Sequence, residues 1–450
     1  MGKELFGTDG IRGVAGEYPL DPVTVHSLGM ALGSDARAMG GELEILIGMD
    51  TRESAPWIAA QVAGGLARRG VRARSAGVIT TPGVAYLTRT GPFCAGVMIS
   101  ASHNPYRDNG SKVFGHSGFK LPDEEEHVIE QEMFRLLEKG VDPEPLDLPV
   151  DAALDRQYLE FLVAAVARPL AGLRVVLDCG NGAAHQLAPE VFGRLGAAVT
   201  ALHCAPYGRN INLGCGALHG VSLRAAVIET GADCGVALDG DADRAIFVAR
   251  SGKIVDGDGV LLVAGRALRA AGRLPGALVV ATVMSNLGLE RAFQREGIRM
   301  VRTPVGDKYV LEEMVRRGAM LGGEQSGHVI FREWATTGDG ILTALRVFDI
   351  AAQAGRGLDE LTADLEIYPQ KLVNVRVREK RPLADIPAVA EEIRLCEEAF
   401  GDAGRVLVRY SGTEPLARVM VQGPVPAEVG EFTRRIAGAI ERELGIAKGE

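Results

Sequence analysis

The segment Gly235-Val-Ala-Leu-Asp-Gly-Asp-Ala-Asp-Arg244 decides the fold class, because an apolar strand in it runs directly into an acidic loop. Short β-branched runs of this kind alternate along the chain with helix-like stretches and glycine-rich turns. This alternation is typical of layered α/β structure. The sequence therefore predicts an α/β fold with mixed, largely parallel sheets.

The acidic loop carries the strongest chemical signal in the chain. Asp239, Asp241 and Asp243 occupy alternate positions, so an extended backbone would project their carboxylates to one side. Three such charges repel one another unless a cation neutralises them, and hard oxygen ligands favour Mg²⁺. An EF-hand is excluded because Arg244 and Arg250 stand where its glycine and glutamate are required. A solvated acidic turn is the alternative to a metal site.

Similar strand and helix cycles flank this segment. Strands are predicted at 43–48, 96–99, 173–177, 196–202 and 277–283, and a helix at 57–69, while 139–151 has the proline-rich composition of a linker. After Pro369 the pattern changes to that of a smaller α+β domain. The predicted organisation is three similar α/β domains followed by this α+β domain, with boundaries at 1–150, 151–252, 253–368 and 369–450.

A serine-containing turn follows the predicted strand at 96–99. In Ser100-Ala-Ser-His-Asn-Pro105 a tight turn would lift a hydroxyl out of the sheet edge, but either Ser100 or Ser102 could be the reactive residue. His103 and Lys112 are candidates for proton transfer or anion contact. An ordinary turn with solvated side chains is the alternative.

Several other segments have the composition of ligand-binding loops. Arg12 lies in the glycine-rich turn 7–13, where the backbone can approach an anion. Arg409-Tyr-Ser-Gly-Thr-Glu-Pro415, followed by Arg418, combines hydroxyls, a glycine amide and guanidiniums suited to phosphate. Glu324, Ser326 and His328 could hydrogen-bond sugar hydroxyls, and His328 could also exchange a proton, so that Lys112 and His328 are candidates for general base and acid with their roles undecided. Plain turns with surface side chains are the alternatives in each case.

Composition limits the partners. The 49 basic and 58 acidic residues give a formal net charge of −9, which argues against general binding to nucleic acid or anionic membranes. The six cysteines lack paired spacing, as expected for thiols in a reducing compartment. No signal peptide or membrane-spanning run is evident, so a cytoplasmic location is expected.

Taken in order, five motifs resemble those of the α-D-phosphohexomutases: 6–13, 100–105, 239–244, 323–328 and 409–415. Within this superfamily, Ser-Ala-Ser-His-Asn-Pro and Glu-Gln-Ser-Gly-His are most similar to the bacterial phosphoglucosamine mutases. The resemblance covers essentially the whole chain. It implies four domains around a central cleft and interconversion of glucosamine 6-phosphate and glucosamine 1-phosphate, with glucosamine 1,6-bisphosphate as intermediate and activator.

The resemblance also implies roles for individual residues. Ser102, rather than Ser100, is the expected phosphorylated serine, and it contributes with Asp239, Asp241 and Asp243 to a Mg²⁺ site. The implied sugar contacts are Glu324 and Ser326, and the implied phosphate contacts are Arg409, Ser411, Gly412, Thr413 and Arg418. The side chains implied to line the cleft are those of Arg12, Lys112, Arg244, Lys308 and His328. Ala242 stands where the family commonly has a second glycine, a change of one methyl group.

Three alternative functions remain at this point. A phosphomannomutase/phosphoglucomutase would share the machinery and differ in its sugar. A metal-dependent phosphatase would pass the phosphoryl group from Ser102 to water, and a non-catalytic protein would only bind sugar phosphates. The expected partner is a phosphosugar, and a homodimer is left open.

Overall fold

A computed structural model describes residues 4–7, 9–39, 43–411 and 415–446. The chain divides into two compact units. One comprises Met1–Met284 with Ile298–Ala363, and the other comprises Ser285–Gly297 with Asp364–Glu450. Within the described ranges, no helix has the length and apolar character needed to cross a membrane.

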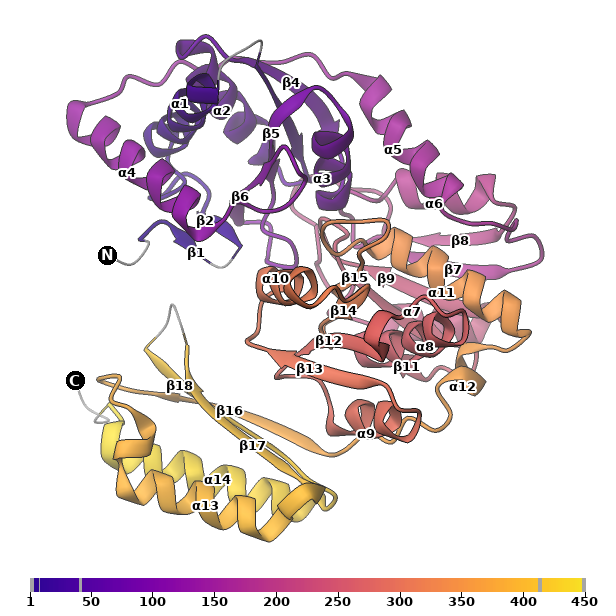
Figure 1. Ribbon diagram of the computed structural model, residues 1–450. Helices are drawn as coiled ribbons and strands as arrows, with labels where there is room; N and C mark the ends of the chain where they lie inside the picture. Colours follow the sequence, from indigo (N-terminus) through magenta and orange to yellow (C-terminus); the bar gives the residue numbers. More distant parts are fainter. Residues whose placement is uncertain (1–3, 8, 40–42, 412–414, 447–450) are drawn as a thin grey trace. The chain divides into compact units, whose positions relative to one another are not determined.

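The first sheet has the strand order β1-β2-β6-β5-β3-β4 (Figure 1). Alternate residues Ile45, Ile47, Val97 and Ile99 face a buried apolar cluster with the helices, as expected for strands with one face against helices. The elements are β1 (Phe6–Gly7), β2 (Gly10–Val14), α1 (Pro22–Met39), β3 (Glu44–Met49), α2 (Ala55–Arg68), β4 (Arg72–Val78), α3 (Thr81–Thr90), β5 (Phe93–Ile99), β6 (Asp108–Gly115) and α4 (Asp123–Lys139).

The second sheet has the order β11-β10-β9-β7-β8. Val176 and Val248 of its strands pack against Leu223 and Val227, which lie on one helix. The elements are α5 (Ala152–Ala164), β7 (Arg174–Asp178), α6 (Leu187–Arg194), β8 (Ala198–Leu202), α7 (Val221–Thr230), β9 (Cys234–Leu238), β10 (Ala245–Ala249) and β11 (Ile254–Val255).

The third sheet has the order β13-β12-β14-β15. Leu278 and Val280 pack against Val310 and Met314 of the helix that follows β13. The elements of this part in the first unit are α8 (Gly257–Ala270), the short 3₁₀ turn η1 (Pro275–Ala277), β12 (Leu278–Thr282), β13 (Arg299–Thr303), α10 (Asp307–Arg317), β14 (Leu321–Gly323), β15 (Val329–Phe331), α11 (Gly340–Ala354) and α12 (Leu358–Leu361).

One pattern of strand pairing recurs in these three sheets. A central strand (β3, β7 or β12) is flanked on both sides by parallel strands, and the second of these (β5, β9 or β14) continues into an antiparallel partner (β6, β10 or β15). The repetition predicted from the sequence is therefore present as topology, and the α/β class with mixed sheets is confirmed.

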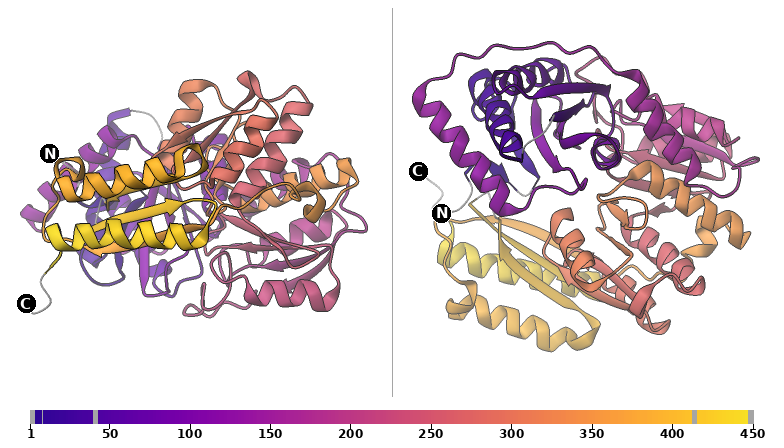
Figure 2. Two further views of the ribbon diagram at one scale, coloured as in Figure 1. Left: turned by 90° about the horizontal axis from the view of Figure 1, so that it is seen from below. Right: turned by 45° about the horizontal axis from the view of Figure 1, so that its top comes forward.

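The C-terminal unit is smaller and has the antiparallel sheet β16-β18-β17. Helices α13 and α14 lie side by side against one face of this sheet (Figure 2). Val419 and Val421 pack there against Ile436 and Ile440. The elements are α9 (Leu287–Arg295), β16 (Gln370–Arg376), η2 (Leu383–Asp385), α13 (Pro387–Phe400), η3 (Gly401–Ala403), β17 (Arg405–Tyr410), β18 (Leu416–Gln422) and α14 (Pro426–Leu444). The predicted α+β character is confirmed.

Candidate active site

The three loops singled out from the sequence occupy equivalent positions in the repeated unit. Each connects the outer parallel strand to its antiparallel partner: 100–107 joins β5 to β6, 239–244 joins β9 to β10, and 324–328 joins β14 to β15. Backbone hydrogen bonds join these loops to neighbouring domains of the unit. The Thr81 N–H donates to the Asp241 carbonyl, and the Ala245 N–H donates to the Gly327 carbonyl, at 3.0 Å each. Their functional side chains therefore gather in one region.

The serine loop has a strained and well-supported backbone. Ser102 adopts a φ of +53°, a left-handed conformation that costs a non-glycine residue roughly 1–2 kcal/mol. Its N–H donates to Ser100 Oγ at 2.9 Å, and Ser100 Oγ in turn donates to Asp50 Oδ2 at 2.6 Å. The Ser100 hydroxyl is thus engaged in holding the turn, which distinguishes it from the hydroxyl of Ser102.

Two polar side chains hold the outer part of the same loop. The guanidinium of Arg52 donates to the Ser102 carbonyl at 3.2 Å and to the Asn104 carbonyl at 2.6 Å. Asn212 Nδ2 donates to the same two carbonyls at 2.9 and 3.3 Å. Arg52 also pairs with Asp50 in a fully buried salt bridge. The loop is therefore fixed from both the first and the second domain.

The hydroxyl of Ser102 faces the acidic loop. Ser102 Oγ donates to Asp239 Oδ2 at 2.5 Å and lies 3.4 Å from His103 Nδ1. Burial, with the nearby charges of Arg244 and Arg12, lowers the pKa of His103 to about 4. At neutral pH this imidazole is uncharged, so it can exchange a hydrogen bond with Ser102 without adding positive charge.

The carboxylates of Asp239, Asp241 and Asp243 are buried and present ligand oxygens within 4.8 Å of one another. Asp241 Oδ1 and Asp243 Oδ1 are buried without a hydrogen bond among the described residues. Burial, and then the charges of Asp243 and Asp241, raise the pKa of Asp239 well above its usual range. An all-oxygen donor set with unused lone pairs fits a hard divalent cation such as Mg²⁺.

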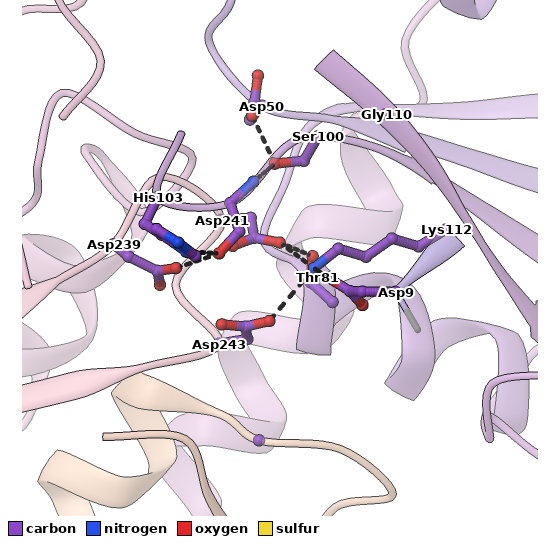
Figure 3. Close-up of polar contacts among 12 residues, drawn as sticks. Asp9, Asp50, Thr81, Ser100, His103, Gly110, Lys112, Asp239, Asp241 and Asp243 are labelled. Atoms are coloured by element: carbon purple, nitrogen blue, oxygen red, sulfur yellow. Dashed lines mark hydrogen bonds and ion pairs between the residues drawn. The ribbon is translucent and has the colours of Figure 1, made fainter. Parts of the chain in front are cut away.

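Lys112 extends from β6 into the acidic group (Figure 3). Its Nζ lies 2.8 Å from Asp241 Oδ2, 3.3 Å from Asp243 Oδ2 and 3.2 Å from Asp9 Oδ2. Burial opposes its charge, but Asp241, Asp9 and Asp243 outweigh burial and hold the pKa of Lys112 well above its usual value. Lys112 is therefore an ammonium ion in this arrangement.

A chain of ion pairs continues from Lys112 to the third domain. Asp9 also pairs with Lys120, whose Nζ lies 2.5 Å from Asp307 Oδ2. Asp307 Oδ2 is in turn 3.4 Å from His328 Nε2. Because the Gly338 N–H donates to the same Nε2 at 3.2 Å, that nitrogen uses a lone pair there and would need a proton to pair with Asp307. His328 therefore stands at the third-domain end of this chain of polar contacts.

The remaining predicted residues of the first unit differ in their surroundings. Arg12 pairs with Asp9, and Arg244 Nε lies 3.8 Å from Asp243 Oδ1, so both guanidiniums border the acidic group. Glu324 Oε1 accepts the Gly306 N–H at 3.1 Å, and Ser326 is exposed. Lys308 instead pairs with Asp123 at 2.5 Å and Glu126 at 3.3 Å, two residues of α4.

The C-terminal hairpin brings positive charges together. Arg409 and Arg418 are directly opposite partners on β17 and β18, and Arg418 donates to Ser411 Oγ at 3.5 Å. Burial, with the charge of Arg418, lowers the pKa of Arg409. Lys380 Nζ adds a third cation, 2.7 Å from the Ser411 carbonyl. Like charges directly opposite each other on a sheet repel, and a bound anion would relieve this repulsion. Guanidinium groups are also well suited to hydrogen-bond a phosphate. Gly412 and Thr413 lie outside the described residues.

Several site residues were missed by reasoning from the sequence. Asp9 lies inside the Gly7–Gly13 motif, so its acidic side chain could have been noticed beside Arg12. Thr81, which donates to Asp241 Oδ2, and Asn212 come from segments without a recognisable pattern. Lys120 and Asp307 are likewise brought together only by the packing of the first and third domains.

Comparison with known proteins places this geometry in a family. The four successive domains of phosphoglucomutase/phosphomannomutase match the chain, namely alpha/beta/alpha domain I at residues 3–139, domain II at 156–252, domain III at 256–368 and the C-terminal domain at 372–439. The chain belongs to this family. Its relatives include the phosphoglucosamine mutase of Solibacter usitatus, which is 69% identical in an alignment that covers 99% of this chain and 100% of the relative. The phosphoglucosamine mutase of Koribacter versatilis is 52% identical in an alignment that covers 99% of this chain and 98% of the relative.

Solved structures share the family fold. A phosphoglucomutase/phosphomannomutase family protein from Burkholderia thailandensis has a TM-score of 0.80 at 24% identity, covering 99% of this chain and 100% of its own. N-acetylphosphoglucosamine mutase from Aspergillus fumigatus, solved with GlcNAc-6P and magnesium, has a TM-score of 0.63 at 18% identity, covering 98% and 96%.

Proposed function

We propose that this enzyme interconverts glucosamine 6-phosphate and glucosamine 1-phosphate through a phosphorylated Ser102. The observation that carries the proposal is the 2.5 Å contact between Ser102 Oγ and the buried aspartate trio. A relative named phosphoglucosamine mutase with 69% identity over the whole chain supports the choice of sugar. We also retain the domain boundaries 1–150, 151–252, 253–368 and 369–450 as part of the proposal.

The proposed site supplies charge stabilisation more than covalent chemistry. Mg²⁺ held by Asp239, Asp241 and Asp243 would neutralise charge on a phosphoryl group at Ser102. Arg52 and Asn212 fix the loop, so that Ser102 Oγ needs little reorganisation during transfer. The ammonium of Lys112, with Arg12 and Arg244 at the border, adds positive charge around the transferred group.

Proton transfer is assigned to His328 in this proposal. Its Nε2 accepts a hydrogen bond from the Gly338 N–H and lies 3.4 Å from Asp307 Oδ2, and an imidazole is the side chain most often used for general acid–base catalysis. Lys112 is less suited to act as a base, because three carboxylates hold its proton. Neutralising those carboxylates would weaken that hold. Glu324 and Ser326 are proposed to contact the sugar hydroxyls.

The hairpin with Arg409, Ser411 and Arg418 is proposed to bind the phosphate that is not being transferred. Two guanidiniums and a hydroxyl match a phosphate dianion, and Gly412 and Thr413 are assigned to the same loop from the family motif. Binding a second phosphate retains the bisphosphorylated sugar, glucosamine 1,6-bisphosphate, for the return transfer to Ser102. This retention favours a mutase over a phosphatase.

A substrate panel tests the proposed reaction. Glucosamine, glucose and mannose 1-phosphates are supplied with catalytic amounts of their bisphosphates, and isomer formation and inorganic phosphate are both measured. We expect the highest kcat/KM for the amino sugar and little phosphate release. A preference for mannose or glucose phosphate would support the phosphomannomutase/phosphoglucomutase alternative, and phosphate release faster than isomerisation would support a phosphatase.

The proposed setting of the enzyme is the cytoplasm, which agrees with its six cysteines being free thiols. Its proposed partner is the phosphosugar alone, without nucleic acid or membrane, and a homodimer is compatible with this role. Size-exclusion chromatography with light scattering separates a monomer from a dimer.

A further inference from the structure

A second group of metal-ligating side chains lies at the carboxyl end of the second sheet, apart from the aspartate trio. Asp178 is the last residue of β7, His203 directly follows β8, and Cys215 comes from the long connection to α7. One ligand atom from each lies within 4.8 Å of the other two. The Asp178 and Cys215 side chains are buried, whereas His203 is 31% exposed and leaves a route for an ion.

The relation between Asp178 and His203 differs from that of a simple hydrogen-bonded pair. His203 Nδ1 is 3.0 Å from Asp178 Oδ1, yet this buried nitrogen makes no hydrogen bond with any described residue. The two atoms are close, but the ring nitrogen is not directed at the carboxylate. Such an arrangement is expected when both groups direct lone pairs toward a shared third position.

The surroundings of the cluster orient its ligands. Asp178 Oδ1 accepts the Gly180 N–H at 2.9 Å, and Oδ2 accepts the Gly216 N–H at 3.0 Å. Asn181 Nδ2 is 3.8 Å from Cys215 Sγ and donates to it. Hydrogen bonds of this kind fix carboxylate and sulfur ligands around protein metal ions. The cluster is therefore already organised by its neighbours.

We propose that Asp178, His203 and Cys215 bind a thiophilic divalent cation such as Zn²⁺. Sulfur, imidazole and carboxylate donors suit Zn²⁺, whereas the all-oxygen trio at 239–243 suits Mg²⁺, so the two sites select different ions. Binding converts the Cys215 thiol to a thiolate and releases one proton to the buffer. Three protein ligands leave a fourth position for water.

The proposed ion has a structural consequence for the serine loop. It joins the end of β7 to the connection 203–216, in which Asn212 donates to the Ser102 carbonyl. The Asn212 N–H also donates to the Gly180 carbonyl at 2.8 Å, beside Asp178. The ion therefore steadies a segment that positions Ser102 while taking no part in phosphoryl transfer.

Cobalt substitution tests the site. Co²⁺ is titrated into the full-length protein in excess Mg²⁺, and the sulfur-to-cobalt charge-transfer band is recorded. We expect the band to saturate at one Co²⁺ per chain and to be displaced by Zn²⁺. Cys215→Ser should abolish it, and so should His203→Asn, which suits the φ of +51° at this position. The control Cys396→Ser alters a buried thiol of the C-terminal unit and should keep the band.

The outcomes are distinct. A band absent from the wild type, or retained in Cys215→Ser, would overturn the proposal, because the aspartate trio contributes no sulfur. Zn²⁺ should also raise the Tm of the wild type and of Cys396→Ser but not that of His203→Asn, and an equal rise in all three would contradict the assignment. Circular dichroism in the absence of added Zn²⁺ and Co²⁺ establishes that each variant is folded.

Discussion

Replacing Lys112 by methionine tests the electrostatic design of the active site. The substitution keeps the length of the side chain but removes the ammonium that neutralises Asp241, Asp243 and Asp9 at 2.8, 3.3 and 3.2 Å. These carboxylates then repel one another in a buried setting. We expect the variant to be strongly destabilised without a divalent cation and to regain much of that stability with Mg²⁺.

The size of the effect follows from these contacts. At an effective dielectric constant of about 20, each contact near 3 Å contributes roughly 5 kcal/mol of attraction. The cost of removing each buried ion from water, several kcal/mol per ion, cancels much of this attraction. Breaking a buried ion pair by removing one partner typically costs about 3–5 kcal/mol, and we expect a loss in that range for Lys112→Met.

Thermal unfolding of the first unit, followed with and without Mg²⁺, measures the loss. The control is Arg135→Met, which removes an ion pair with Glu132 from a side chain that is 50% exposed, where solvent screens the charges and little loss of stability is expected. We expect Mg²⁺ to raise the Tm of Lys112→Met by several degrees more than that of the wild type or the control. Equal shifts in all three proteins would refute the argument that Lys112 and the metal compensate the same charges.

Three further changes test other parts of the structure. Ser100→Ala should lower stability by about 1–3 kcal/mol in urea unfolding, because the Ser102 N–H loses its acceptor, yet should still allow labelled phosphate onto Ser102. Arg418→Met should raise KM roughly 10- to 100-fold, because a charge-assisted phosphate contact disappears. An unchanged KM would contradict the anion site. Burial raises the pKa of Asp339 to about 6, so folding favours its protonated form. The folded state then binds more protons than the unfolded state between about pH 4 and 6, and stability from this group falls as pH rises through that range, by at most about 3 kcal/mol. Asp339→Asn should remove this decrease in the free energy of unfolding. If the free energies of wild type and variant changed with pH in parallel, Asp339 would not be the cause of the decrease.

The sequence was sufficient for those parts of the fold that depend on local patterns. The apolar runs at 43–48 and 235–238 are strands β3 and β9, each within a residue of the predicted ends, because buried parallel strands are continuous apolar segments. The carboxylates of Asp239, Asp241 and Asp243 converge as predicted, but the extended backbone expected to bring them together is absent, because this segment is a turn with Ala242 at a φ of +57°.

Contacts between distant segments could not be predicted in the same way. Ser100 and Ser102 were equivalent by local chemistry, and contacts with two distant residues distinguish their hydroxyls: Ser100 donates to Asp50 and Ser102 donates to Asp239. The pairing of Lys120 with Asp307 depends on how two domains pack, and no periodicity encodes it. The ion pairs of Lys308 with Asp123 and Glu126 of α4 also join distant segments, and its expected position at the substrate site stays a prediction.

Transfer of phosphate to Ser102 is the central step of the account and can be measured directly. The protein is incubated with labelled glucosamine 1,6-bisphosphate and Mg²⁺, quenched within one turnover, digested and mapped by mass spectrometry. We predict phosphate on the peptide containing Ser102 in the wild type and in Ser100→Ala, and none in Ser102→Ala. Label on any other residue, or normal turnover by Ser102→Ala, would contradict the account.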